Sequence, residues 1–383
     1  MTTVDVLIPV YNGAKTVRES VESVQRQTFG DLAIILVDDG STDDTAAILA
    51  EMASRDPRIR VHRQANGGIV EAMNSGLGLC TSEFVARLDA DDICYPNRIE
   101  VQLAYLRANP AVVAVGAAVR HIDAAGALLG TIARLGSPEL ADPYFVPSAE
   151  PYIIHPFLTV RRAAIGAVGG YRQVHYAEDT DLYWRLRDLG QLVNLDDILG
   201  EYRMHTESIS GASILNARVS AINSQLASIS EQRRRRGECD IAFKKDSITV
   251  YKQAGTLAAM VAIASEGLDA SERRYMAEAT AAKLLELAAY RPFELDASDC
   301  AFVGDVARRG FAHLPAINAG LLNRRISGTA ARIAASGRMR DALQMVTVRR
   351  LFSFAPRYLS RATLPTQLSQ RLRRRYTRES AYK

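Results

Sequence analysis

The acidic residues that follow the apolar run 83–88 have the types and spacing to do chemistry. Asp89 and Asp91 are two positions apart, Asp92 follows directly, and Pro96 prevents a smooth continuation of the strand. Carboxylates with this spacing can hold a hard cation such as Mg²⁺ or Mn²⁺, which completes its shell from phosphate oxygens and water. An Asp-rich turn without a ligand is the structural alternative.

A second pair of carboxylates, Asp38 and Asp39, ends another apolar run and opens onto a helical segment. Residues 41–44 can account for the start of that helix, with Ser41 or Thr42 as its N-cap. That explanation leaves the two aspartates unused. Because ligands of α/β proteins bind at the carboxyl ends of parallel strands, both are functional candidates.

Short β-branched runs alternate with amphipathic segments from residue 4 to about residue 120. We expect strands over 4–10, 32–37, 59–62 and 83–88, and helices over 16–27, 42–55 and 68–79. Strands that alternate with helices at this spacing favour βαβ units on a largely parallel sheet. The pattern predicts an α/β domain that holds both acidic clusters at the carboxyl ends of strands.

The chain beyond residue 210 is rich in alanine and poor in strand signals. We expect helices over 214–236, 247–264, 271–289 and 315–335. Residues 211–383 are therefore predicted to be α-helical, and they end in a basic tail almost free of acids over 349–378. Its mixture of Arg, Leu and Phe is typical of a helix on anionic lipid, and a solvated end without a partner is the alternative.

The composition excludes several classes of protein. With 48% hydrophobic and 23% charged residues, the chain is not disordered throughout, and a net charge of +4 argues against a nucleic-acid-coating protein. The four cysteines lie far apart, which fits neither a disulfide framework nor a zinc ribbon. No secretory signal and no apolar stretch of about 20 residues is evident, so a cytoplasmic location is expected.

Five ordered motifs together resemble the family 2 inverting glycosyltransferases, which have the GT-A fold. They are Ile-Pro-Val-Tyr-Asn at 8–12, Val-Asp-Asp-Gly-Ser-Thr-Asp at 37–43, Asn-Gly-Gly at 66–68 leading to 72–76, Asp-Ala-Asp-Asp at 89–92 with Pro96 and Arg98, and Ala-Glu-Asp at 177–179. The resemblance covers about residues 1–210. It implies a GT-A Rossmann-like catalytic domain, with a mainly parallel central sheet, that binds a nucleotide-sugar.

The resemblance also implies where the donor binds. Pro9, Tyr11 and Asp39 match the nucleobase pocket, in which the aspartate accepts a hydrogen bond from a uracil N–H, so the donor is a UDP- or dTDP-sugar. Asn66 and Gly67 match the segment beside the diphosphate and the sugar. An Asn-Gly-Gly turn before a helix explains these two nearly as well.

For the metal, Asp89 and Asp91 match the family's DxD motif, whose carboxylates bind ribose and a Mn²⁺ or Mg²⁺ ion on the diphosphate. Asp92 is expected to support them. Residues 202–210 resemble the terminal Tyr-Arg-x-His-x-x-Ser-x-Ser element of many relatives, which makes Arg203 a phosphate contact and His205 a metal ligand. A solvated loop histidine is the alternative for His205.

Asp179 is the predicted catalytic base. An acceptor hydroxyl that attacks the anomeric carbon must lose its proton, and a carboxylate within hydrogen-bond reach is suited to take it. Glu178 and Asp179 match the family's Glu-Asp pair at the start of a helix, and compensation of the helix dipole is the structural alternative. Direct displacement by the acceptor predicts inversion.

These observations predict a metal-dependent inverting glycosyltransferase that acts on a glycan or lipid-linked acceptor in cell-surface polysaccharide synthesis. The basic tail would place it peripherally on the cytoplasmic face of the membrane. A non-catalytic GT-A-like scaffold of a glycan assembly complex is the alternative. The chain lacks GxGxxG after its first strand and lacks GxxxxGK[ST], which excludes a dinucleotide oxidoreductase and a P-loop NTPase.

Overall fold

The computed structural model describes residues 2–205 and 213–346, and the chain divides into two compact units. The first holds the chain up to Ala141 together with Glu150–Gln173 and Glu178–His205. The second, which we call the helical unit, holds Asp142–Ala149, Val174–Ala177 and the described residues 213–346. The predicted boundary at residue 210 falls between the described ranges and stays a prediction.

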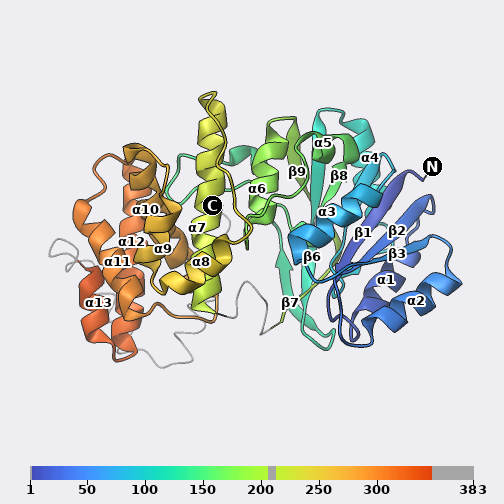
Figure 1. Ribbon diagram of the computed structural model, residues 1–383, viewed down its shortest axis with the longest axis horizontal. Coiled ribbons are helices and arrows are strands. Elements are labelled where there is room, and N and C mark those ends of the chain that lie inside the picture. The colour runs from blue at the N-terminus through green and yellow to red at the C-terminus, as the bar shows by residue number, and fades with distance from the viewer. Residues whose placement is uncertain (1, 206–212, 347–383) are drawn as a thin grey trace. The chain divides into compact units, whose positions relative to one another are not determined.

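The first unit is built on a nine-stranded sheet in the order β3-β2-β1-β4-β8-β6-β9-β5, with β7 paired to β6 (Figure 1). The strands are β1 (Val4–Val10), β2 (Leu32–Asp38), β3 (Ile59–Arg63), β4 (Phe84–Arg87), β5 (Ile93–Cys94), β6 (Val112–Ile122), β7 (Leu128–Ala133), β8 (Thr159–Arg161) and β9 (Gln191–Arg203). The pairings orient β1, β2, β3, β4, β6 and β9 in one direction and β5, β7 and β8 in the other. The predicted α/β class and mostly parallel sheet are confirmed.

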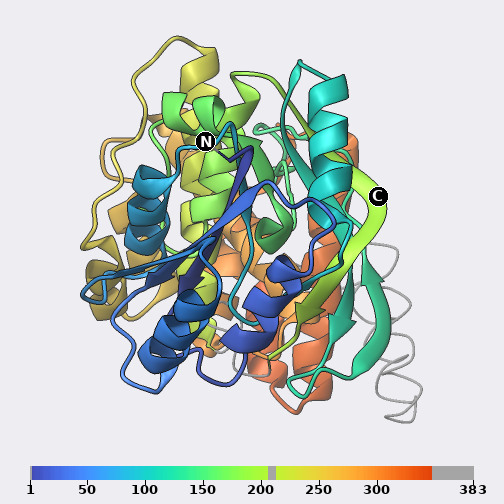
Figure 2. The same cartoon turned by 90° about the vertical axis from the view of Figure 1, so that its right-hand side faces the viewer.

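Helices cover both faces of this sheet (Figures 1 and 2). Because successive side chains of a strand point to opposite faces, Val6 and Ile8 of β1 join one core and Leu7 joins the other. Buried side chains of α1 (Val17–Gln25), α2 (Thr45–Arg55) and α4 (Arg98–Ala108) pack in the first core. Buried side chains of α3 (Ile69–Leu79), α5 (Arg162–Ala167) and α6 (Glu178–Arg187) pack in the second core. Two 3₁₀ turns, η1 (Pro138–Leu140) and η2 (His155–Phe157), lie in the connections.

The helical unit has its own hydrophobic core. Its helices are α7 (Ile214–Arg235), α8 (Ser247–Ala254), α9 (Leu257–Ala264), α10 (Ala270–Tyr290), α11 (Ala297–Arg309), α12 (Ala316–Ala335) and α13 (Met339–Met345). The single helix predicted over 247–264 is wrong. Gly255 has a φ of +72° and ends α8, and the Thr256 hydroxyl then caps α9 by accepting a hydrogen bond from the Ala259 amide.

None of the helices in the described ranges is long and apolar enough to cross a lipid bilayer. The predicted basic tail over 349–378 lies outside the described residues, as does the end of the 202–210 motif. The other run of arginines, at 233–236, closes α7 and forms ion pairs with Glu231, Glu238 and Glu272.

Candidate active site

The loops that follow β1, β2 and β4 meet at one edge of the sheet because these strands are parallel neighbours. The register sets Val10 beside Asp38 and Leu7 beside Arg87. The acidic turn therefore begins two residues after β4 at the edge where Asp38 ends β2. Sequence reasoning predicted this placement from the order of strands and helices.

Side chains tie the loop after β1 to the loop after β2. Asn12 Oδ1 accepts a hydrogen bond from the Thr42 amide (2.8 Å), and the Asn12 amide donates to Ser41 Oγ (2.9 Å). α2 begins only at Thr45, whose amide donates to Asp43 Oδ1 (3.1 Å). The predicted capping of α2 by Ser41 or Thr42 is therefore wrong, because both residues bind the loop after β1 instead.

Asp39 joins the end of β2 to the turn at 66–68. Its Oδ1 accepts hydrogen bonds from Gln64 Nε2 (2.8 Å) and the Gly67 amide (2.9 Å), and Oδ2 accepts one from the Gly68 amide (2.8 Å). Two carboxylate oxygens offer about four lone-pair sites, so one site on Oδ2 stays available. The structure thus brings Asp39 and Gly67 together.

The other residues predicted to bind the donor lie on β1 or directly after it, and on the turn at 66–68. Pro9 is buried in β1, and Tyr11 directly after the strand is 54% exposed. A Cβ at Gly40 would lie 2.7 Å from the Asn66 amide nitrogen, so the loop after β2 approaches the turn as closely as a glycine allows. Asn66 is therefore held beside the residue that follows Asp39.

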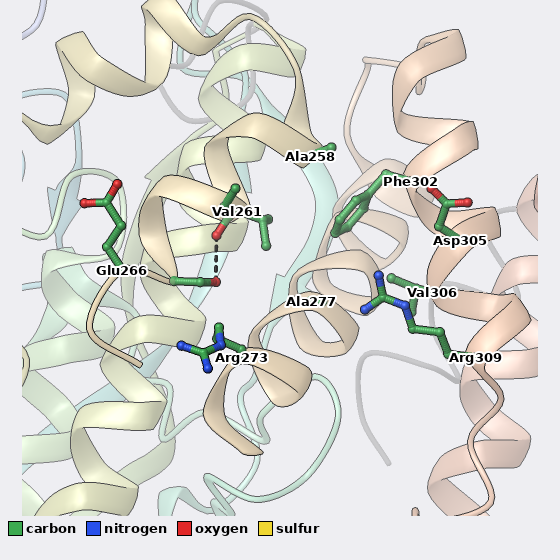
Figure 3. Close-up of a pocket in the computed structure, with 11 residues that line it drawn as sticks. Ala258, Val261, Glu266, Arg273, Ala277, Phe302, Asp305, Val306 and Arg309 are labelled. Atoms are coloured by element: carbon green, nitrogen blue, oxygen red, sulfur yellow. Dashed lines mark hydrogen bonds between the residues drawn. The ribbon is translucent and has the colours of Figure 1, made fainter. Parts of the chain in front are cut away.

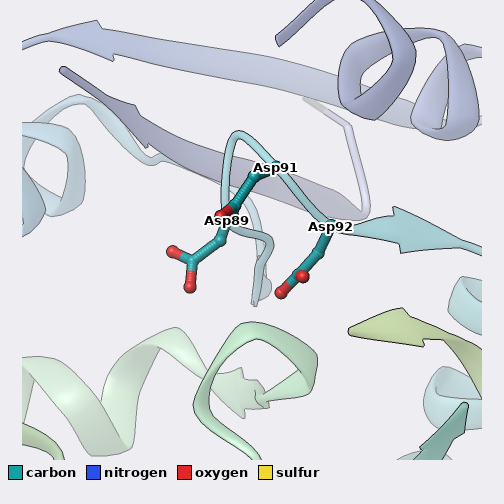
Figure 4. A group of neighbouring side chains, drawn as sticks. All are labelled: Asp89, Asp91 and Asp92. Carbon is teal, nitrogen blue, oxygen red and sulfur yellow. The ribbon is translucent and has the colours of Figure 1, made fainter. Parts of the chain in front are cut away.

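The acidic turn gathers three carboxylates. Oxygens of Asp89, Asp91 and Asp92 lie within 4.8 Å of one another (Figure 4). Asp92 is buried, its Oδ1 accepts a hydrogen bond from the Arg203 amide (2.8 Å), and its Oδ2 has no partner among the residues described. Three neighbouring carboxylates, one of them with an unpartnered buried oxygen, fit a hard divalent cation.

The closeness of these carboxyl groups raises the pKa of two of them. Burial, and then the neighbouring Asp89 and Asp91, raise the pKa of Asp92 well above its usual range. Burial and Asp91 likewise raise the pKa of Asp89, and Arg87 opposes that rise. A bound cation would favour the ionised forms of all these carboxylates.

Arg203, the last residue of β9, and His205, two residues later, both contact the acidic turn. His205 Nε2 lies 2.7 Å from Asp91 Oδ2. Arg203 Nε donates to the Asp91 carbonyl (2.8 Å), Nη2 to Glu19 (2.7 Å), and Nη1 to two backbone carbonyls (3.3 Å). Every nitrogen of this guanidinium is thus committed to an acceptor within the protein.

Glu178 and Asp179 begin α6. Asp179 Oδ1 accepts a hydrogen bond from the Thr180 amide (2.7 Å), whereas Oδ2 has no hydrogen-bond partner within the described ranges. The negative charge of Asp179 also contributes to the raised pKa of Asp89. Burial and then Asp179 raise the pKa of Glu178 to about 7, and burial also raises the pKa of Asp179.

Arg87 is a site residue to which sequence reasoning gave no role. It is buried, its Nη2 donates to Asp89 Oδ1 (2.6 Å), and its Nε and Nη1 have no partner in the described part of the chain. Its charge opposes the rise in the pKa of Glu178 and of Asp179. The available signal was a basic residue at the end of an otherwise apolar strand, just before three aspartates.

Comparison with known sequences identifies related proteins. The sequence profile described as "Glycosyl transferase family 2" matches residues 5–169. The chain is 34% identical over 209 residues to the amylovoran biosynthesis glycosyltransferase AmsE of Erwinia amylovora, a match that covers 54% of this chain and 77% of that protein. It is 32% identical over 210 residues to the chondroitin synthase of Escherichia coli, covering 54% of this chain and 30% of that protein.

The solved structures that match the chain are more distant in sequence. The mannosyltransferase PcManGT from Pyrobaculum calidifontis, in complex with GDP-Man and Mn²⁺, is 16% identical with a TM-score of 0.49, and the match covers 94% of this chain and 87% of that chain. S. aureus TarS in complex with UDP-GlcNAc is 15% identical with a TM-score of 0.47, covering 90% of each chain.

Proposed function

Because the chain belongs to glycosyl transferase family 2, we propose that it transfers a sugar from a UDP- or dTDP-sugar to a hydroxyl group of a glycan or lipid-linked acceptor. The observation that carries the proposal is the cluster of three carboxylates in the acidic turn after β4, at the sheet edge where β2 ends before Asp39. The charge of Asp179 at the start of α6 also acts on Asp89 of this turn.

The nucleobase is assigned to the surface formed by Pro9, Tyr11 and Asp39. The free lone pair of Asp39 Oδ2 can accept a ring N–H, which a uracil or thymine base offers. Tyr11 is exposed and can cover the base with its ring. Asn66 and Gly67 then lie beside the diphosphate and the donor sugar.

The metal is assigned to Asp89 and Asp91 with His205, and Asp92 supports the turn through the hydrogen bond that it accepts from the Arg203 amide. A bound Mn²⁺ or Mg²⁺ would stabilise the negative charge of the departing nucleoside diphosphate. Arg203 is assigned to positioning this turn, since a direct phosphate contact would require it to exchange one of its present hydrogen bonds.

Asp179 is assigned as the base. Its Oδ1 is held by the Thr180 amide, so Oδ2 is the atom that takes the proton from the attacking acceptor hydroxyl. The hydroxyl oxygen displaces the nucleoside diphosphate in one step, which inverts the configuration at the anomeric carbon. Arg87, whose Nη2 donates to Asp89 Oδ1, lowers the pKa of both Asp89 and Asp179 and so favours their ionised forms.

The biological setting is also a proposal. The relative named for amylovoran biosynthesis supports a role in cell-surface polysaccharide synthesis. We assign residues 1–210 to catalysis and residues 211–383 to contact with acceptor, membrane or partner, with the basic tail over 349–378 as the peripheral membrane contact.

A panel of nucleotide-sugars incubated with the purified protein tests the proposal. We expect UDP or dTDP to be released from one donor with Mn²⁺ or Mg²⁺ and not with EDTA. Asp91→Asn should abolish this release, and Asp197→Asn, which changes an exposed aspartate of β9, should not. If no donor is cleaved and UDP does not bind, the proposed function is wrong.

A further inference from the structure

The hollow between α9, α10 and α11 of the helical unit does not select a particular ligand (Figure 3). Its lining mixes apolar and charged side chains, and Arg273 already donates a hydrogen bond to the Leu268 carbonyl. Asp305 already pairs with Arg308. A chain of hydrogen bonds that ends without a partner among the described residues lies instead in the first unit, at His155.

His155 opens the η2 turn, which is fixed to the end of β4. The Leu158 amide donates a hydrogen bond to the His155 carbonyl (3.2 Å), and the Leu158 carbonyl accepts one from the Arg87 amide (2.8 Å). Arg87 is the last residue of β4, two positions before Asp89. His155 is therefore held beside the strand that leads into the acidic turn.

His155 also lies beside the helix that carries the proposed base. Its ring packs edge-on against the ring of Tyr183, with 6.1 Å between the ring centroids. Tyr183 is buried in α6, four residues after Asp179. Because side chains four residues apart share one face of a helix, His155 contacts the face of α6 that carries Asp179.

Tyr171 determines which nitrogen of His155 carries the proton. The Tyr171 hydroxyl lies 2.7 Å from Nε2 and has no other hydrogen-bond partner among the described residues. Tyr171 is buried, and burial raises its pKa, so the hydroxyl keeps its proton and donates a hydrogen bond to Nε2. Burial and the charge of Arg87 lower the pKa of His155 well below its usual range, so the ring is neutral. Its single N–H is therefore at Nδ1.

Asn74 of α3 fixes the position of Tyr171. Asn74 Nδ2 donates a hydrogen bond to the Tyr171 carbonyl (2.8 Å), and the Tyr171 amide donates one to Asn74 Oδ1 (2.9 Å). Gly170 has a φ of +71°, and a Cβ there would lie 2.6 Å from Asn74 Oδ1, so this approach requires a glycine. These three residues therefore support the orientation of His155 from α3, the helix that follows the turn at 66–68.

The Nδ1–H group of His155 has no acceptor in the part of the chain that the structure describes, and the residue keeps part of its surface exposed. The Tyr183 hydroxyl and the Nε and Nη1 atoms of Arg87 are buried and also lack a partner among these residues. Buried polar groups in proteins are nearly always hydrogen-bonded. This cluster therefore needs a polar ligand or water to complete its hydrogen bonds.

We propose that His155 donates a hydrogen bond from Nδ1 to a hydroxyl oxygen of the donor sugar. The inference rests on the proposed function, in which that sugar lies between the diphosphate and Asp179. His155 is held beside β4, which leads into the acidic turn, and beside α6, which carries Asp179. A neutral donor suits a sugar hydroxyl, because it forms a hydrogen bond without adding charge next to the carboxylates. His155 thus favours a nucleotide-sugar over the bare nucleotide.

Two variants separate the roles of the two ring nitrogens. In His155→Asn the amide nitrogen takes the place of Nδ1, whereas in His155→Gln the amide takes the place of Nε2 and can still contact Tyr171. Calorimetric titration of the full chain with Mn²⁺ measures the affinity for UDP, UDP-glucose, UDP-galactose and UDP-N-acetylglucosamine. For the UDP-sugar that the wild type binds most tightly, His155→Gln should lower the affinity about tenfold through the loss of one hydrogen bond, and His155→Asn should stay within about threefold of the wild type.

UDP affinity should be unchanged in both variants, which also shows that they fold. His121→Gln, which changes a partly exposed histidine of β6, is the control and should match the wild type. Equal UDP-sugar affinities in the two His155 variants, or a larger loss in His155→Asn, would overturn the inference, since His155 would then act only through Tyr171 or not at all. If the wild type does not bind UDP, the proposed function is wrong and the inference fails with it.

Discussion

Asp179 has one carboxylate oxygen held by the Thr180 amide and one without a partner among the described residues. Asp179→Asn keeps the shape of the side chain and removes its basicity. Transfer should slow by about 100-fold or more, the usual contribution of a general base. UDP affinity should change little. Initial rates and UDP titration measure the two effects, and a variant that keeps more than a tenth of the wild-type rate would exclude Asp179 as the base.

Asp92 illustrates a conflict between stability and metal binding. The pKa of Asp92 is raised in the folded protein, so folding disfavours its ionised form. At neutral pH, which is above the pKa of the unfolded chain, Asp92 therefore lowers the free energy of unfolding. Asp92→Asn keeps an oxygen for the Arg203 amide and adds a donor toward Asp89 and Asp91.

Asp92→Asn should therefore raise the free energy of unfolding by about 1 kcal/mol in EDTA, while weakening Mn²⁺ binding. Urea unfolding of the wild type and the variant, each with and without Mn²⁺, measures both effects. If the variant has a lower free energy of unfolding than the wild type in EDTA, Asp92 does not destabilise the folded protein.

Single residues were predictable where their type is unusual for their place. Aspartates at the end of a buried strand are such a case, and Asp39, Asp89 and Asp91 were all named from the sequence. Glu19 was not, because its partner Arg203 is distant in the sequence and its role comes from the fold. The free oxygens of Asp39 and Asp179 also require coordinates.

At the scale of elements, Gly76 sets how closely α3 packs on β1 and β2. A Cβ at Gly76 would lie 2.2 Å from Leu7 Cδ1 and 3.1 Å from Val37 Cγ2. Gly76→Ala should lower the free energy of unfolding by about 1–3 kcal/mol, because the close packing leaves no room for a methyl group. The turn at 66–68, which leads into α3, should shift with the helix.

Gly78→Ala is the matched control in the same helix. A Cβ at Gly78 meets no atom within 4 Å, so the change should raise the free energy of unfolding by about 0.5–1 kcal/mol through helix propensity. Urea unfolding of both variants gives the comparison. Equal effects would mean that α3 does not pack on β1 in this way.

Strands that are buried on both faces could be predicted from the sequence. β1 and β2 read as continuous apolar runs, and their bounds in the structure differ from the predicted bounds by at most one residue. β9 was not predicted, because its polar residues interrupt the pattern and its pairing with β6 joins segments far apart in the sequence. The break at Gly255 was missed because periodicity continues across it.

At the scale of the whole molecule, each unit has its own core and can respond differently to pH. In the helical unit, Glu272 of α10 pairs with Arg233 (2.6 Å) and Arg236 (2.8 Å) at the end of α7. The hydrogen bond from Arg233 lowers the pKa of Glu272 to about 2. A lowered pKa gives stability that is present above the unfolded pKa and is lost as the pH falls toward 2.

Glu272→Gln should therefore destabilise the helical unit by about 2 kcal/mol at pH 7 and have a diminishing effect as the pH falls below about 4.3. Unfolding followed by helix circular dichroism between pH 7 and pH 2.5 measures this. Glu266→Gln, at an exposed position, is the control. A difference between Glu272→Gln and wild type that does not shrink in acid would contradict the ion pair.

The central claim is that the acidic turn holds a divalent cation together with a nucleoside diphosphate. The most direct test is Mn²⁺ binding, followed by electron paramagnetic resonance with and without UDP. We predict that UDP strengthens Mn²⁺ binding to the wild type and to Asp197→Asn, and that Asp91→Asn weakens it at least about tenfold. Undiminished Mn²⁺ binding by Asp91→Asn in the presence of UDP would contradict the account.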